Sequence, residues 1–217
     1  MNPEDFVAAV IAKYRRSRIP VHRHKKLSRG ESRSIASETE DLLAYYLVTR
    51  VPSIDRIFIN QPMTIGRKSV RERLKPDLVI CKPSEVCALV DVKMDLGYQR
   101  DDFGPSLRKK NRLMTRLRGQ KFRLLARKGN GRDPITLRLS PRAKYLSVVI
   151  SDRNIAPAHF NEIEKSAASL GATALYVLTR DCHPNEYGFS KKQIMKKIEI
   201  CHNAFRGIER EIRQAIA

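Results

Sequence analysis

The stretch from residue 76 to residue 94 reads PDLVICKPSEVCALVDVKM. It contains two runs rich in apolar residues, Asp77 to Lys82 and Val86 to Met94, separated by Pro83-Ser84-Glu85. Short apolar runs of this kind are typical of buried strands, and a three-residue connection suits an antiparallel pair. The stretch therefore predicts a β-hairpin.

The second run of this hairpin carries charged residues between apolar ones. Side chains of a strand alternate between faces, so Asp91 and Lys93 share one face, while Val90 and Val92 share the other. Asp77 opens the neighbouring strand and can lie beside Asp91 at one end of the sheet. Two carboxylates so close together repel each other, and a hard divalent cation is their usual partner. The hairpin therefore predicts a site that combines two acids, a lysine and a metal ion.

Hydrophobic periodicity predicts further elements on both sides of the hairpin. Helices are expected over residues 3–17, 34–50, 106–119, 158–170 and 190–216, and strands over residues 56–65, 145–151 and 173–179. Ser37 and Glu40 resemble a capping box near the start of the second helix. This order favours an α/β fold with a mixed central β-sheet of about five strands flanked by helices.

The length of 217 residues suits a single domain. Within it we expect an N-terminal helix and basic loop over residues 1–33 and a core over residues 34–180. An irregular or hairpin-shaped basic insertion is expected near residues 119–143. A C-terminal helical segment over residues 181–217 should pack on the core.

The charge indicates a polyanionic partner. Lys and Arg number 43 against 23 Asp and Glu, which gives a formal net charge of +20. Such an excess favours contacts with nucleic-acid phosphates. In the helix 106–119, Leu107 and Met114 are expected to face inward and the basic residues outward. The candidate nucleic-acid contacts are His24, Lys25, Lys26, Arg108, Lys109, Lys110, Arg112, Arg116, Arg127, Lys128 and Arg132. For the loop over residues 21–33, a solvated segment without a partner is an equal alternative.

The remaining composition favours a soluble, intracellular protein. The chain begins with an acidic segment rather than a secretory signal, and no apolar window is long enough for a membrane span. The cysteines are expected to be free thiols. The adjacent pairs Cys182-His183 and Cys201-His202 do not match the ligand spacing of structural zinc sites.

Pro76-Asp77 followed by Asp91-Val92-Lys93 resembles the signature of the PD-(D/E)xK nuclease superfamily, whose members have the restriction-endonuclease-like fold. The resemblance covers roughly residues 34–179. It implies one or two Mg²⁺ ions, with Mn²⁺ as a substitute, bound by Asp77, Asp91 and the backbone carbonyl of Val92. It also implies that Lys93 acts on the attacking water and the scissile phosphate.

The resemblance further implies an acid from the first core helix. Glu38 and Glu40 lie at similar angles from the apolar face, so helical geometry hardly separates them. The acid-led run from Glu40 to Ala44 favours Glu40, which is expected to complete the catalytic site as a further metal ligand. Asp95 could join the site if the strand continued that far, but it is expected to end the strand before Gly97.

These expectations combine into a magnesium-dependent nuclease, favouring DNA over RNA and endonucleolytic cleavage of restriction, repair or mobile-element type. Cleavage of both strands would imply a homodimer. One alternative is a catalytically silent nucleic-acid-binding module with the same fold, in which Asp91 and Lys93 form an edge-strand ion pair and Asp77 caps a turn. The other is a basic scaffold protein that binds RNA.

Overall fold

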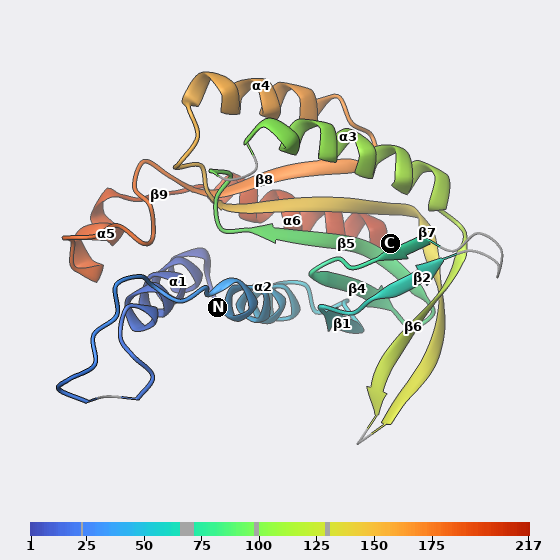
Figure 1. Ribbon diagram of the computed structural model, residues 1–217. Coiled ribbons are helices and arrows are strands. Elements are labelled where there is room, and N and C mark those ends of the chain that lie inside the picture. Colours follow the sequence, from blue (N-terminus) through green and yellow to red (C-terminus); the bar gives the residue numbers. More distant parts are fainter. Residues whose placement is uncertain (23, 66–71, 98–99, 129–130) are drawn as a thin grey trace.

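The hairpin predicted from residues 76–94 lies inside the sheet of the computed structural model (Figure 1). Its strands are β4 (Leu78–Lys82) and β5 (Glu85–Lys93), which pair antiparallel with Leu78 opposite Val90. On its other side β5 runs parallel to β7 (Gly131–Ser151). Because β5 has neighbours on both sides, its backbone groups are paired within the sheet, and apolar side chains can cover both of its faces.

The structure describes residues 1–22, 24–65, 72–97, 100–128 and 131–217. Within these ranges nine strands form one mixed sheet. In sheet order they are β1 (Arg56–Ile59), β4, β5, β7, β6 (Lys121–Lys128), β2 (Met63–Ile65) and β3 (Glu72–Leu74), with β8 (Thr173–Arg180) beside β7 and β9 (Glu199–Ile200) beside β8. The α/β class and the mixed sheet are confirmed, but the prediction of about five strands was too low.

The basic insertion explains part of this difference. Residues 121–128 and 131–151 form a long hairpin of β6 and β7, and it extends beyond the helical layers in Figure 1. Its second strand runs on into the predicted core strand 145–151. Val86 and Ala88 of β5 pair with Leu139 and Lys144 of β7, so the register shifts at a β-bulge between them. Because of this bulge, β7 is continuous from the basic hairpin into the core sheet.

Helices cover both faces of the sheet. One face carries α1 (Pro3–Ser17), α2 (Ala36–Arg50) and α6 (His202–Ile216), whose apolar residues form one core with those of β5 and β7. The other face carries α3 (Arg100–Leu117) and α4 (Pro157–Ala168). The short α5 (Lys191–Lys197) precedes β9. None of the described helices is long and apolar enough to cross a membrane.

Four local predictions were wrong. The strand expected over residues 56–65 breaks at Asn60, which adopts a φ of 52°, a conformation that Asn tolerates well. The helix expected over residues 190–216 is interrupted by β9. The helix expected from Ser106 already begins at Arg100. The second helix begins at Ala36, so the expected capping box of Ser37 and Glu40 does not form.

A buried carboxylate ties the C-terminal helix to α2. Glu209 is 4% exposed and accepts hydrogen bonds from Tyr46 Oη at 2.7 Å, Arg50 Nε at 3.2 Å and Arg213 Nη2 at 3.0 Å. Burial opposes its ionisation, but these donors outweigh burial and lower its pKa. The C-terminal segment is therefore held to the core by a satisfied charged network as well as by apolar packing.

Gly207 of α6 permits the close approach of that helix to β8. A Cβ atom at this position would lie 2.5 Å from Cε1 of Tyr176. Alanine is normally better than glycine in a helix by about 1 kcal/mol, but here the ring must move. We therefore expect Gly207→Ala to lower the free energy of unfolding by about 1–3 kcal/mol, measured by chemical denaturation. Gly171→Ala is the matched control because its Cβ meets nothing within 4 Å. A Gly207→Ala variant as stable as the parent would contradict this packing.

Candidate active site

The register of the hairpin brings the two acids together. Leu78 pairs with Val90, and continuing this antiparallel register by one residue places Asp77 opposite Asp91. Oδ2 of Asp77 accepts a hydrogen bond of 2.7 Å from the backbone N–H of Val92. Asp77 is thereby fixed at the end of β4, beside the end of β5.

Both carboxylate oxygens of Asp91 have partners. Oδ1 accepts a hydrogen bond from the hydroxyl of Tyr145 on β7 at 2.6 Å, and Oδ2 accepts one from Nζ of Lys110 on α3 at 2.5 Å. The Lys110 ammonium also lies 4.8 Å from the centroid of the Tyr145 ring. Burial and the negative charge of Asp91 both raise the pKa of Tyr145, so its hydroxyl stays protonated as a donor. Asp91 is therefore held in one orientation by two donors.

Lys93 lies two residues after Asp91 on the same face of β5 and is partly exposed. Among the described residues no carboxylate lies within ion-pair distance of its ammonium group. Its positive charge partly opposes the rise that burial causes in the pKa values of Asp77 and Glu40. Lys93 thus acts electrostatically on both acids.

The structure brings Glu40, rather than Glu38, towards the hairpin. Glu40 is 7% exposed, and its Oε2 accepts a hydrogen bond from the side-chain amide of Asn60. The backbone N–H of Asn60 in turn donates to the carbonyl of Asp77 at 2.7 Å. Glu38 instead faces outward and forms an ion pair with Lys13 at 3.0 Å. Asn60 therefore links the helix acid to the acid at the start of β4.

Burial raises the pKa of Glu40, with a smaller contribution from the charge of Asp77. Burial also raises the pKa of Asp77, and the charge of Asp91 adds to the effect, against the opposing Val92 N–H and Lys93. The acids thus carry an unfavourable electrostatic energy that a further cation would relieve.

The donor set fits a hard divalent cation. Asp77 and Asp91 supply carboxylate oxygens, and Val92 supplies a backbone carbonyl beside them. Magnesium is commonly held by one or two carboxylates with water completing its octahedron. Within the described ranges, no three His, Cys, Asp or Glu side chains gather closely enough to form a metal cage on their own. The oxygen donors present are of the type that Mg²⁺ prefers.

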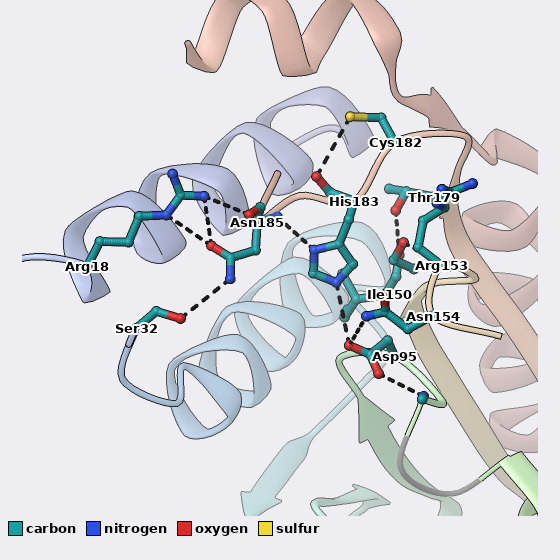
Figure 2. Close-up of polar contacts among 12 residues, drawn as sticks. Arg18, Ser32, Asp95, Ile150, Arg153, Asn154, Thr179, Cys182, His183 and Asn185 are labelled. Atoms are coloured by element: carbon teal, nitrogen blue, oxygen red, sulfur yellow. Dashed lines mark hydrogen bonds and ion pairs between the residues drawn. The ribbon is translucent and has the colours of Figure 1, made fainter. Parts of the chain in front are cut away.

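Asp95 lies outside this site. Its Oδ2 accepts a hydrogen bond from Nδ2 of Asn154 at 3.1 Å and lies 3.5 Å from Nε2 of His183, while its Oδ1 accepts from the N–H of Gly97 at 2.9 Å (Figure 2). The contact with His183 lowers the pKa of Asp95. Asp95 follows the end of β5, as expected, and ties that end to the loop after β8. The Cys182 thiol beside His183 donates to the carbonyl of His183 at 3.8 Å.

The predicted nucleic-acid contacts fall into three groups. His24, Lys25 and Lys26 are exposed in the loop between α1 and α2. Four basic side chains of α3 are also exposed, and Arg108 among them donates to Oγ of Ser166 at 3.3 Å. They are Arg108, Lys109, Arg112 and Arg116. Arg127, Lys128 and Arg132 lie near the tip of the β6–β7 hairpin, and their side chains fall outside the described residues.

Lys110 corrects the predicted orientation of α3. It was expected to face outward with the other basic residues, but it is partly buried and faces the sheet, where it contacts Asp91. The sequence held a signal for this placement. Phe103, Leu107, Met114 and Leu117 form the buried stripe of the helix, and Lys110 falls on the same stripe at helical spacing. Tyr145 and Asn60 were also missed, because their roles depend on strand pairing.

Comparison of the chain with protein-family models, with curated proteins and with solved structures gives no match.

Replacing each aspartate by asparagine should change the free energy of unfolding in opposite directions. The pKa of Asp77 is raised on folding, so ionisation of this carboxyl group destabilises the folded state. This destabilisation is absent below the unfolded pKa of about 3.9 and is complete above the folded pKa. In metal-free buffer at pH 7, Asp77→Asn should raise the free energy of unfolding, on the order of 0.5 kcal/mol. Asp91→Asn should lower it by about 1–2 kcal/mol because the charged contact with Lys110 is weakened.

Chemical denaturation at pH 7 and pH 3 measures both effects. The gain from Asp77→Asn should vanish at the lower pH, where the aspartate is protonated in both states. A loss of stability in Asp77→Asn at pH 7 would contradict the electrostatic account of the site.

Proposed function

We propose that this chain is a magnesium-dependent nuclease that hydrolyses phosphodiester bonds in DNA, built on a restriction-endonuclease-like core. The observation that carries the proposal is the hairpin register, which places Asp77 opposite Asp91 with Lys93 on the same strand face as Asp91. The approach of Glu40 from α2 through Asn60 adds a fourth group of the expected chemistry.

Each group has a distinct role in the proposed reaction. Asp77, Asp91 and the carbonyl of Val92 would hold Mg²⁺, or Mn²⁺ in its place. When bound, the ion would neutralise charge at the phosphate and make the attacking water more acidic. Lys93 donates to the scissile phosphate and orients the attacking water. Glu40, whose pKa is raised by burial, is suited to accept a proton from that water nearer neutral pH.

The basic surface supports a nucleic-acid substrate. Exposed Arg108, Lys109 and Arg112 lie on the same helix as Lys110, which contacts the candidate metal ligand Asp91. Lysine and arginine contacts to phosphates position a nucleic acid without reading its sequence. DNA and endonucleolytic cleavage, as in restriction, repair or mobile-element enzymes, are the substrate and mode that we propose. Cleavage of both strands would require a homodimer.

The central experiment incubates the purified chain with plasmid, linear duplex, single-stranded DNA and RNA, each with magnesium or with chelator. We expect magnesium-dependent nicking or linearisation of plasmid, and loss of at least about 100-fold in rate for Asp91→Ala and Lys93→Ala because transition-state charge is no longer neutralised. Cleavage of no substrate with any divalent metal, or full activity in both variants, would refute the nuclease. Preferential cleavage of RNA would overturn only the choice of substrate.

The two helix acids provide a matched pair of variants. Glu40→Gln should reduce the cleavage rate about 100-fold because the group that accepts the proton is lost. Glu38→Gln should stay within about twofold of the parent, because it removes only an exposed ion pair with Lys13. Single-turnover cleavage of plasmid measures both. Equal losses of cleavage rate in the two variants, or a larger loss in Glu38→Gln, would show that Glu40 is not the proton acceptor.

A catalytically silent nucleic-acid-binding module is the second candidate. It is favoured by one observation: the Lys110 ammonium already neutralises Asp91, as a structural ion pair would. Such a module would bind DNA or RNA in a salt-sensitive manner without any dependence on divalent metal. Binding isotherms over a range of salt, with magnesium and with chelator, separate it from the nuclease.

A further inference from the structure

Lys110 occupies a position in α3 that lysine rarely takes. The buried stripe of the helix consists of Phe103, Leu107, Met114 and Leu117, each at most 3% exposed, and Lys110 lies between Leu107 and Met114 on that stripe. An ammonium group withdrawn from water is costly unless a carboxylate compensates it. The position of Lys110 therefore depends on a specific anionic partner.

That partner is Asp91. The side chains of Lys110 and Asp91 are only 17% and 14% exposed, and Nζ and Oδ2 lie 2.5 Å apart. The face of the Tyr145 ring at 4.8 Å also favours the ammonium group. This is a partly desolvated contact rather than a solvent-screened surface ion pair.

We propose that Lys110 is an internal counter-cation of Asp91 that competes with the divalent metal and sets the metal concentration at which the site loads. The proposal rests on the proposed function, since it requires that Asp91 be a metal ligand. It makes Lys110 a positioning residue that acts through Asp91, distinct from Lys93 on the strand.

The competition follows from the two oxygens of Asp91. Tyr145 donates to Oδ1, and Lys110 donates to Oδ2. A neutral hydroxyl can remain beside a metal-bound carboxylate, but a second cation on Oδ2 is repelled by the ammonium group. The metal therefore has to displace Lys110, whose four-carbon side chain is flexible enough to move away. Tyr145 keeps the carboxylate oriented during the exchange.

The test is the affinity for Mg²⁺ alone, in the absence of nucleic acid. Magnesium titration by calorimetry, and the rise of the unfolding temperature with magnesium, are compared for the parent and Lys110→Met. We expect about tenfold tighter binding in Lys110→Met, the factor that corresponds to one charged hydrogen bond. Lys165→Met, which removes an exposed lysine from the neighbouring helix α4, is the control and should stay within about twofold of the parent.

The outcomes separate this proposal from the nuclease proposal. Equal or weaker magnesium binding in Lys110→Met overturns the role of Lys110 while leaving the metal site intact. Absence of magnesium binding in both the parent and Lys110→Met removes the metal site itself. If Lys110→Met does not fold, Lys110→Gln, which keeps a polar end without the charge, is measured in its place. In the Asp91→Asn background, the substitution of Lys110 should no longer change the affinity.

Discussion

The strand β5 pairs with β4 on one side and with β7 on the other, and this double pairing fixes the positions of the other groups of the site. With neighbours on both sides, β5 has little freedom of register, since a shift by one residue would turn its charged side chains into the opposite core. The antiparallel pair places Asp77 beside Asp91, and the parallel pair places Tyr145 within hydrogen-bond distance of the same carboxylate. The candidate site is therefore a consequence of strand pairing rather than of a flexible loop.

The three acids of the site differ in how their negative charge is compensated. Glu40 and Asp77 are held where burial disfavours their ionisation, whereas Asp91 is paired with Lys110. Lys93 reduces the electrostatic cost at both acids. Such an arrangement is poorly explained as a device for stability, because desolvation of the two carboxylates lowers stability. It is well suited to a cation that arrives from solution and to an anion that follows it.

Much of the fold could be predicted because its signals are local. Short apolar runs predicted β4, β5 and β8, and helical periodicity predicted α1, α2 and α4 close to their observed bounds. The continuity of β6 and β7 with the core sheet was missed because charged and exposed residues obscured the strand pattern. The strand predicted over residues 56–65 ends at Asn60 because this residue has a positive φ, which hydrophobic patterning does not predict.

Periodicity along the chain sets which residues share a face of a strand or helix, such as Asp91 with Lys93, or Lys110 with Leu107 and Met114. Which of these side chains come into contact depends on the packing of elements that are distant in the chain. Asn60 contacts Glu40 and Lys13 contacts Glu38, so the two helix acids lie in different surroundings. The packing of α3 against β7 brings Lys110 to Asp91. Periodicity determines the direction of a side chain within its own helix or strand. The partner of a charged side chain depends instead on which distant elements the sheet brings together.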